Sequence, residues 1–464
     1  MRRKPNTVCE HTGLTREVGV EPRGNVKALS KSATSERRRD GNQRDQEKLL
    51  ERILSRDNLN LAYQKVKANR GSHGVDGMTV DELLPLLKRD GEKLRQSILC
   101  GEYEPQAVRR VEIPKQDGGV RLLGIPTVVD RMIQQAIAQE LTTIFDPGFS
   151  ENSYGFRPGK SAHQAVIAAR GHIEQGYSWT VDIDLEKFFD KVNHKKLMNR
   201  VARKVKDKRV LRLIDRYLES GIMINGVRVK SEEGTPQGGP LSPLLANIML
   251  DDLDKELEKR GHKACRYADD CNIYVKSLRA GERVMRSIGK YIENELKLKI
   301  NHQKSAVDRP SKRKFLGFSF YKFKGKVRNY IPQKPIQRFK TKVKEITARS
   351  KGVDMQTRQD RLNWLITGWV NYFQIADMKG IATELDMWIR RRIRMCYWKQ
   401  WKKVGARRDN LVKLGIQNGK AWEYANTRKG CWRVAGSYIL DKSLTNKYLE
   451  DEGFLTLTMV LSEG

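Results

Sequence analysis

The spacing of apolar residues changes along the chain, and the changes predict both helices and strands. Residues 1–45 mix charged residues with Ser, Gly and Asn without an apolar period, so we expect a basic, disordered arm there. Helical spacing begins near Leu49. From Val108 apolar and polar residues alternate, and Gly118 and Gly119 mark a turn before a second short run. This segment predicts a hairpin that carries basic side chains.

Further along, helices and short strands continue to alternate. Residues 129–141 carry apolar residues at helical spacing, and residues 178–190 are expected to form a strand that enters a helix. Ser242 and Pro243 are typical of the N-cap and the first turn of a helix that ends before Gly261. Beyond about Val327 the chain becomes helical, aromatic and strongly basic. A helical region is therefore expected after a region of mixed structure.

The charge of the chain indicates a polyanionic partner. The sequence contains 90 Lys and Arg against 56 Asp and Glu, which gives a formal net charge of +34. A positive field of this size favours nucleic acid as the partner. A ribosomal type of protein, or one that is merely soluble and basic, is the alternative that composition leaves open. The hydrophobic content of 38% is enough for a substantial core.

Cysteine usage and apolar runs bound the compartment. Six cysteines are scattered without paired spacing, so neither a zinc ribbon nor a disulfide framework is indicated, and we expect reduced thiols. The basic N-terminus is not followed by an apolar segment of the signal-peptide type. No apolar run reaches the roughly 18 residues of a membrane span. We expect a cytoplasmic protein without a membrane partner.

Two acidic segments, residues 180–190 and 266–275, lie in surroundings typical of strands. Asp269 and Asp270 should occupy a tight turn, where their repulsion at ~4 Å costs roughly 4 kcal/mol unless a cation such as Mg²⁺ removes it. If the first segment pairs beside this hairpin, Asp184 and Asp269 converge around two ions about 3.5–4 Å apart. A plain polar turn is the commoner fate of such a dipeptide. Asp182 and Asp184 share one strand face, so spacing alone does not choose between them.

The same segments resemble two motifs of reverse transcriptases. Residues 267–270, Tyr-Ala-Asp-Asp, look like the Y-x-D-D box, and residues 184–190, Asp-Leu-Glu-Lys-Phe-Phe-Asp, look like the first catalytic motif. The resemblance implies that Asp184, Asp269 and Asp270 bind two Mg²⁺ ions, with Mn²⁺ as a substitute. It also implies that Asp182 is a supporting residue and that Phe189 excludes a 2′-hydroxyl.

Further motifs of the family follow in order. Residues 234–243 are similar to its template and nucleotide loop, residues 315–318 to its primer-grip turn, and residues 298–305 to a segment with a phosphate-facing lysine. The resemblance implies two further groups of site residues: nucleotide-binding Lys115, Arg121, Gln237, Gly238 and Lys304, and primer-grip Phe315, Leu316 and Gly317. Read without the family, the two finger cations would be solvated and the aromatic cluster would be core.

The resemblance narrows to the group II intron-encoded reverse transcriptases and maturases and covers about residue 48 to beyond 430. It is carried by residues 58–63 with 74–77, by Ser-Tyr-Gly-Phe-Arg-Pro at 153–158 and by Gly-Trp-Val-Asn-Tyr-Phe at 368–373. It implies an α/β (α+β) right-hand polymerase followed by an α-helical domain. The expected regions are the arm at 1–45, fingers and palm at 46–326, a thumb or maturase domain X at 327–408, and a small nucleic-acid-binding segment at 409–464.

The expected thumb can also be interpreted physically. Its apolar helical stripe should pack inward, while a following helix carries cations interleaved with aromatic residues, which suits backbone neutralisation and base stacking. About half of these aromatic residues should simply be buried. The predicted RNA-binding cations are Arg390, Arg391, Arg392, Arg394, Lys399, Lys402 and Lys403.

Taken together, the sequence predicts an RNA-directed DNA polymerase encoded by a group II intron, which also binds the intron RNA to assist splicing and mobility. The implied partners are intron RNA, an RNA template with a DNA or RNA primer, target-site DNA and deoxynucleoside triphosphates. Residues 431–464 lack the paired cysteines of an H-N-H nuclease, so we expect no endonuclease. Two alternatives stay open: a splicing cofactor with a vestigial polymerase, and a host-adopted reverse transcriptase in defence or repair.

Overall fold

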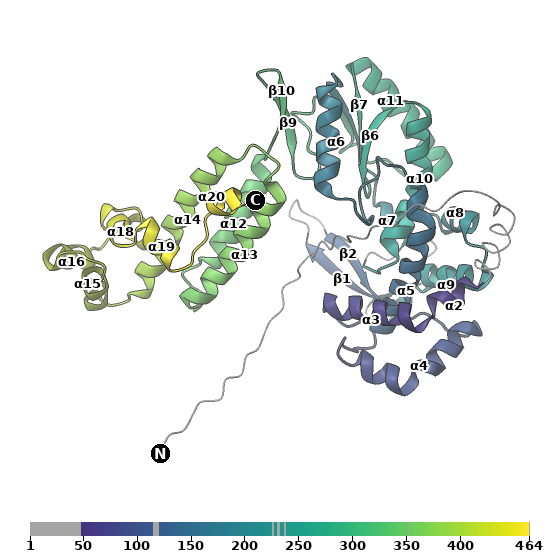
Figure 1. The fold of residues 1–464 in the computed structure, drawn as a ribbon, viewed down its shortest axis with the longest axis horizontal. Coiled ribbons are helices and arrows are strands. Elements are labelled where there is room, and N and C mark those ends of the chain that lie inside the picture. Colours follow the sequence, from purple (N-terminus) through teal and green to yellow (C-terminus); the bar gives the residue numbers. More distant parts are fainter. Residues whose placement is uncertain are drawn as a thin grey trace, which may run out of the picture.

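The computed structural model describes residues 48–114, 120–224, 227–229, 233–235, 238–350 and 352–463, and the predicted N-terminal arm lies outside them. Figure 1 shows a mixed region of helices and strands beside a helical lobe that begins at α12. The helices of the mixed region are α2 (Leu49–Ile53), α3 (Arg56–Asn69), α4 (Leu83–Leu99), α5 (Val128–Phe145), η1 (Asp146–Gly148), α6 (Ala162–Glu174), α7 (Phe188–Lys191), α8 (His194–Lys204), α9 (Lys208–Glu219), α10 (Ser242–Lys259), α11 (Leu278–Tyr291) and η2 (Ile292–Leu296).

The strands form three described sheets, ordered β2-β1-β4-β5, β6-β7-β3-β8 and β10-β9. Their bounds are β1 (Val108–Pro114), β2 (Val120–Ile125), β3 (Trp179–Ile183), β4 (Ile222–Ile224), β5 (Val227–Val229), β6 (Lys263–Tyr267), β7 (Asp270–Val275), β8 (Ala306–Asp308), β9 (Ser319–Phe323) and β10 (Lys326–Tyr330).

The fingers are built on the predicted basic hairpin. Strands β1 and β2 pair antiparallel, as their alternating pattern predicts, and β4 adds parallel to β1. Beneath them, the Ser55 and Thr127 side chains accept hydrogen bonds that cap α3 and α5. Capping satisfies backbone donors that the first turn of a helix leaves open. These two helices pack on each other in the main hydrophobic core.

The sheet ordered β6-β7-β3-β8 packs apolar residues against helices on both of its faces. Val181 and Ile273 belong to one face and pack in the same core as α10 and α11, where Gly281 lets α11 approach Val307 closely. Tyr274, on the other face, meets His172 of α6 with ring centroids 5.6 Å apart. Helices therefore cover both faces of the sheet, which fixes its strands firmly.

The helical lobe begins after the β9–β10 hairpin. A second hydrophobic core joins α6, this hairpin and the lobe helices, so the lobe is attached to the palm through packed side chains. The lobe contains α12 (Gln333–Ile346), α13 (Met355–Phe373), α14 (Lys379–Gln400), α15 (Val404–Lys413), α16 (Asn418–Ala425), α17 (Cys431–Val434), α18 (Tyr438–Ser443), α19 (Asn446–Asp451) and α20 (Leu457–Glu463).

Helix α13 holds the C-terminal segment on the lobe. Its residues Gln359 and Asn363 donate hydrogen bonds of 2.7 and 2.8 Å to the carbonyls of Glu452 and Gly453, near the end of the chain. Helix α20 then packs against both α13 and α14 (Figure 1). The C-terminal segment is therefore folded back onto the lobe.

Some predicted boundaries differ from the observed ones. The expected break at residue 408 cuts through α15, and the lobe helices start at Gln333, because residues 326–330 still belong to a strand of the hairpin. The first residue of α10 is Ser242, and Leu241 occupies the N-cap position that was predicted for Ser242. Within the described residues, no helix combines the length and apolarity that a membrane crossing requires.

Candidate active site

A strained hairpin turn carries two of the predicted carboxylates. Tyr267 pairs with Asp270 across β6 and β7, so Ala268 and Asp269 form the two-residue turn between them. Ala268 has φ of +57° although it carries a Cβ, a conformation that costs about 1 kcal/mol and is rare outside turns. The predicted tight turn is present, and Asp270 is the first residue of the following strand.

The register of the palm sheet brings the third carboxylate to this turn. Strand β3 runs antiparallel to β7 with Ile183 opposite Cys271, which puts Asp184 at the position that faces Asp270. Residues that face each other across an antiparallel pair project from the same side of the sheet. The Asp184 backbone is held by Ser305, whose hydroxyl accepts from its N–H at 3.0 Å.

The Asp270 carboxylate lies near several other negative charges. Although the residue is exposed to solvent, the pKa of its carboxyl is raised from 3.8 to about 7. The first cause is desolvation of the charged form by the protein atoms packed around it, followed by the charges of Asp269, Asp182 and Asp184, while Lys304 opposes the shift. A cation near these oxygens would relieve that repulsion, so the set has a net attraction for positive charge.

The neighbouring Asp182 carboxylate forms an ion pair with Arg313. Its Oδ2 accepts from Arg313 Nη2 at 2.5 Å and from Arg313 Nε at 3.0 Å, and the same guanidinium donates to the Lys304 carbonyl at 2.6 Å. Burial raises the pKa of the Asp182 carboxyl despite this partner. The structure places the two carboxylates that spacing left open differently. Arg313 links Asp182 to the backbone of Lys304, whereas the strand register puts Asp184 opposite Asp270.

The donor set fits a hard divalent cation, but it is not a preassembled cage. In the described parts of the chain, no group of three or more His, Cys, Asp and Glu residues is arranged closely enough to hold a metal ion by itself. Mg²⁺ is typically bound by one or two carboxylates together with waters and substrate phosphates. The crowded oxygens of Asp184, Asp269 and Asp270 suit that kind of shared site.

A cavity of about 300 Å³ lies between the finger strands and the start of the palm. Phe189 lines the cavity, and both Phe189 and its neighbour Phe188 are buried in the core, at 9% and 2% exposure. Arg110 and Thr235 also line it, and within the described residues their buried Nε and Oγ1 atoms have no hydrogen-bond partner. Unpaired buried donors are rare in proteins, so these two suit a polar ligand.

Several predicted nucleotide-binding residues can be followed only in part. Lys115 and Gln237 lie outside the described residues, and of Arg121 only the backbone, in β2, is described. Gly238 has φ of +125°, and a Cβ there would lie 2.7 Å from the Gly124 carbonyl oxygen. A glycine is therefore required where the loop approaches β2. Lys304 is exposed and lies near the carboxylates.

The predicted primer-grip turn is a second tight hairpin. Phe315 and Phe318 exchange backbone hydrogen bonds of 2.8 and 2.9 Å, with Leu316 and Gly317 both at positive φ between them. The Tyr372 hydroxyl of α13 donates to the Leu316 carbonyl at 2.8 Å. Phe315 and Phe318 are buried, so this cluster is both core and turn. The lobe thus holds the turn directly.

The predicted RNA-binding cations divide into two groups. Lys399, Lys402 and Lys403 are exposed on the lobe. Arg394 is buried and donates to the Leu444 carbonyl, Asp441 and Asn446, so we remove it from the RNA-contacting set. Its role is to hold α18 and α19 on α14.

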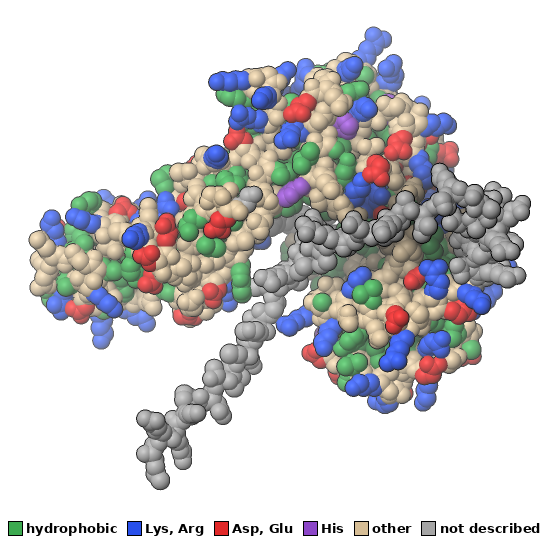
Figure 2. Space-filling model, in the orientation of Figure 1, with side chains coloured by type: hydrophobic (Ala, Val, Ile, Leu, Met, Phe, Trp, Pro, Cys, Tyr) green, Lys and Arg blue, Asp and Glu red, His purple; other side chains and the backbone are tan. Residues whose placement is uncertain are grey.

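The remaining arginines are partly engaged as well. Arg391 stacks on Trp432 at 4.1 Å, and Arg392 donates to the Thr347 hydroxyl at 2.8 Å. Four aromatic residues are interleaved with these cations, and about half of them were expected to be buried. Trp388 is half-buried, and three are buried: Tyr397, Trp398 and Trp401. Figure 2 shows Lys and Arg side chains spread over both the lobe and the mixed region on the face in view, with acidic side chains between them.

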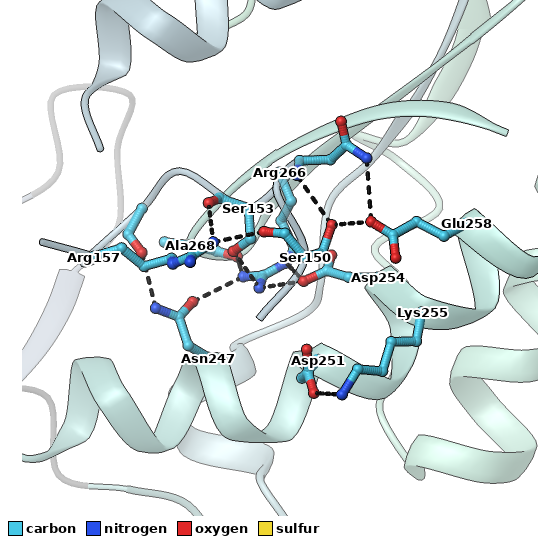
Figure 3. Close-up of polar contacts among 12 residues, drawn as sticks. Ser150, Ser153, Arg157, Asn247, Asp251, Asp254, Lys255, Glu258, Arg266 and Ala268 are labelled. Atoms are coloured by element: carbon cyan, nitrogen blue, oxygen red, sulfur yellow. Dashed lines mark hydrogen bonds and ion pairs between the residues drawn. The ribbon is translucent and has the colours of Figure 1, made fainter. Parts of the chain in front are cut away.

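Sequence reasoning missed the residues behind the catalytic turn. Arg266 is buried and forms an ion pair with Asp254 of α10, with Nη2–Oδ2 at 2.6 Å (Figure 3). Arg110 and Lys187, which line the cavity beside Phe189, were not predicted from the sequence either. The alternation of β1 marked basic positions without telling which faces the cavity. For Arg266, the available signal was a charged residue within an apolar strand.

Two sequence families match consecutive parts of the chain. Reverse transcriptase (RNA-dependent DNA polymerase) matches residues 113–320, and the maturase-specific domain of group II introns matches residues 336–415. The chain is 33% identical over 301 residues to protein YkfC of Escherichia coli strain K12, covering 56% of this chain and 79% of YkfC. It is 38% identical over 209 residues to the group II intron-encoded protein LtrA of Lactococcus lactis, covering 45% of this chain and 35% of LtrA. The chain belongs to the group II intron-encoded reverse transcriptases and maturases.

Family membership assigns the parts of this group II intron-encoded reverse transcriptase. The fingers and palm are an RNA-directed DNA polymerase domain of a divalent-metal-dependent class, and the lobe contains the maturase-specific domain. The predicted family, fold class and enzyme class are confirmed. A solved Cas6-RT-Cas1–Cas2 complex is 28% identical, covers 53% of this chain and 43% of its own, and has a TM-score of 0.35. The region that matches LtrA covers only 35% of the length of LtrA.

Proposed function

We propose that this reverse transcriptase copies RNA into DNA at Asp184, Asp269 and Asp270 and that its helical lobe binds the RNA of its own intron. The observation that carries the first half is the register of β3 against β7, which puts Asp184 opposite Asp270 at the strained turn. The second half rests on the maturase-specific domain and the exposed lysines of the lobe.

The reaction is a nucleotidyl transfer. The 3′-hydroxyl oxygen of the primer attacks the α-phosphorus of a deoxynucleoside triphosphate, the bond to pyrophosphate breaks, and the hydroxyl proton leaves to solvent. Asp184, Asp269 and Asp270 would hold two Mg²⁺ ions, or Mn²⁺ in their place, which when bound activate the hydroxyl and stabilise the leaving pyrophosphate. The chain's own residues orient the two reactants.

The 300 Å³ cavity supports a place for the incoming nucleotide. Phe189 would lie against the sugar and exclude a 2′-hydroxyl, while Arg110, beside the predicted Lys115 and Arg121, would donate to the triphosphate. Lys304 would face the phosphates from the other side, held by Arg313. Gln237 and Gly238 would border the base, and Phe315, Leu316 and Gly317 would place the primer end.

The remaining partners follow from the same reading. We propose that the exposed lysines Lys399, Lys402 and Lys403, with Arg390, Arg391 and Arg392, contact intron RNA, and that residues 409–464 contact nucleic acid at the DNA target. The protein would then assist splicing and copy the intron into DNA in the bacterial cytosol. The expected division into fingers and palm, thumb and C-terminal segment is retained, with the helical part beginning at α12.

Primer extension on an RNA template with deoxynucleotides and Mg²⁺ tests the polymerase. Asp269→Asn should lower the extension rate at least about a hundredfold, because metal-mediated charge stabilisation is worth several kcal/mol and each 1.4 kcal/mol is tenfold. The matched control is Asp57→Asn on the exposed side of α3, which should leave extension unchanged. Absence of extension by the wild type with any divalent metal would contradict the polymerase and favour a splicing cofactor with a vestigial polymerase.

Splicing assistance is tested separately with RNA transcribed from the DNA flanking the gene. The wild type and Asp269→Asn should accelerate its splicing equally, since the carboxylates are not expected to contact the intron. They should also bind this RNA more tightly than RNA of equal length and unrelated sequence at the same salt concentration. Equal affinity for both RNAs, without acceleration of splicing, would reject the maturase half.

A further inference from the structure

The buried guanidinium of Arg266 lies directly behind the catalytic turn (Figure 3). In the β6–β7 pairing Arg266 is opposite Cys271, whereas Tyr267 is opposite Asp270. Successive residues of a strand project from opposite faces, so Arg266 lies on the face of α10 and the carboxylates lie on the other. Arg266 therefore cannot contact a substrate, and any influence on the reaction must pass through the residues it holds.

Every N–H donor of this guanidinium has an acceptor. Nε donates to the Asp254 carboxylate at 2.7 and 3.0 Å, and Nη2 donates to the same carboxylate at 2.6 Å and to Ser153 Oγ at 2.7 Å. Nη1 donates to Asn247 Oδ1 at 3.1 Å and to the Ala268 carbonyl at 2.7 Å. A buried charge with all five donors satisfied is fixed in one orientation.

The Ala268 carbonyl belongs to the strained residue of the turn. The nitrogen of the same residue is packed against Gly155, where a Cβ would lie 2.3 Å from it. Asn247, which accepts from Arg266, also donates to the Gly155 carbonyl at 2.8 Å. Ala268 is therefore held at its carbonyl by Arg266 and packed at its nitrogen against Gly155. A backbone in a sparsely populated conformation persists only when its surroundings determine it.

The palm offers a comparison that separates this role from ordinary core support. Arg200 of α8 is also a buried arginine with a carboxylate of α10, donating from Nε to Asp252 at 2.8 Å and from Nη1 to the Lys196 carbonyl at 2.8 Å. Its contacts in the described structure are with helices. Of these two arginines, only Arg266 contacts the backbone of the turn, at the Ala268 carbonyl that precedes Asp269.

We propose that Arg266 is a positioning residue for catalysis: by holding the Ala268 carbonyl it fixes the turn so that Asp269 and Asp270 present their oxygens to the metal ions. This inference rests on the proposed polymerase function and adds a residue to it. Asp254, Asn247 and Ser153 orient the guanidinium and therefore influence the turn only through Arg266. Residues that orient metal ligands in this way typically change metal affinity or activity by 10–100-fold when removed.

The test compares Arg266→Lys with Arg200→Lys in the full-length protein. Lysine keeps the charge beside the carboxylate but lacks the planar fork, so it cannot hold Asp254, Ser153 and the Ala268 carbonyl together. For Arg266→Lys we expect kcat of RNA-templated extension to fall about 10–100-fold and the half-saturating Mg²⁺ concentration to rise, with the KM for the nucleotide nearly unchanged. Arg200→Lys should change none of these by more than about twofold.

A readout other than activity is the affinity for Mn²⁺, measured from the free-ion electron paramagnetic resonance signal. Arg266→Lys should bind Mn²⁺ about tenfold or more weakly than Arg200→Lys at equal template–primer affinity. Equal Mn²⁺ affinity and equal kcat in the two variants would overturn the inference, whereas an inactive wild type would reject the polymerase itself.

Folding failure is covered by a milder variant. If Arg266→Lys does not fold, Ser153→Ala removes a single support of the guanidinium and leaves its charge pair intact. We expect Ser153→Ala to keep the thermal midpoint close to that of the wild type and to raise the half-saturating Mg²⁺ concentration severalfold. Wild-type metal dependence in Ser153→Ala, at unchanged stability, would then overturn the role of Arg266.

Discussion

At the scale of single residues, the ion pair between Asp182 and Arg313 separates two carboxylates that look equivalent in the sequence. Asp182 is occupied by Arg313, whereas Asp184 faces Asp270 across the sheet. We expect Asp184→Asn to lower the extension rate at least about a hundredfold and Asp182→Asn only about tenfold, because the second change acts through Lys304.

Single-turnover extension with saturating nucleotide measures both rates. The KM for the nucleotide should rise in Asp182→Asn, since Arg313 would no longer be held where it supports the Lys304 carbonyl. A larger loss in Asp182→Asn than in Asp184→Asn would show that the two roles are reversed.

Phe189 gives a second prediction at this scale. Its ring lines the 300 Å³ cavity that we propose for the nucleotide, so Phe189→Ala should lower the preference for deoxynucleotides over ribonucleotides by about tenfold to a hundredfold. The ratio of kcat/KM for the two substrates is the measurement. Phe188→Ala is the control: this ring is buried in the core, so the variant should lose about 3–5 kcal/mol of stability and retain its discrimination.

The sequence contained the identities of these residues but not their partners. The strand alternation limited the first carboxylate to Asp182 or Asp184, and the resemblance to the family selected Asp184. The choice on physical grounds depends on Arg313, which is more than a hundred positions away in the chain and meets Asp182 only after folding. Arg266 and Arg110 were missed for the same reason, because their roles depend on long-range contacts.

At the scale of elements, an acidic and basic cluster docks α2 on the start of α9. Arg209 donates to Glu51 at 2.7 and 2.9 Å and to Asp207 at 2.9 Å, and Asp207 accepts from the Leu50 N–H at 3.1 Å. The Arg209 hydrogen bonds lower the pKa of Glu51. For Asp207, burial raises the pKa, but the bonds from Arg209 and Leu50 outweigh it and leave a net lowering.

Because both folded-state pKa values lie below their usual 4.5 and 3.8, this cluster stabilises the fold above the unfolded values and loses that contribution as pH falls through the folded ones. Arg209→Met should therefore lower the thermal midpoint at pH 7, and its difference from wild type should shrink from about pH 5 downward. The exposed Arg89→Met, which loses a pair with Asp90, is the control and should show no such trend. A difference independent of pH would contradict the assignment.

Element types were predicted better than their limits. The basic hairpin, the strand before Asp184 and the helix after Pro243 are all present where alternation and helical spacing placed them. The start of the helical region was placed too early because β10 continues the strand pattern past Val327, and cap geometry shifted the start of α10 by one residue. Both limits depend on backbone contacts that a local pattern does not contain.

At the scale of the whole molecule, the charge of +34 predicts binding that weakens with salt. The exposed lysines at the end of α14 are the sharpest test. Replacing Lys399, Lys402 and Lys403 together by Ala should reduce the slope of log affinity against log salt by up to about 2, at roughly 0.7 per phosphate contact on single strands.

The matched control replaces three exposed lysines of the fingers, Lys65, Lys88 and Lys93, and so changes the net charge equally. Filter binding of flanking-intron RNA at several salt concentrations measures both slopes. An equal reduction in the two triple variants would mean that total charge, and not the lobe, determines the affinity.

Helix α13 has one further consequence for the working molecule. Tyr372 near its end holds the turn at residues 315–318, while Gln359 and Asn363 hold the segment near the end of the chain. A helix of 19 residues is a stiff rod about 28 Å long at ~1.5 Å per residue. A displacement of the C-terminal segment would therefore be transmitted along this one rigid helix to the turn at residues 315–318.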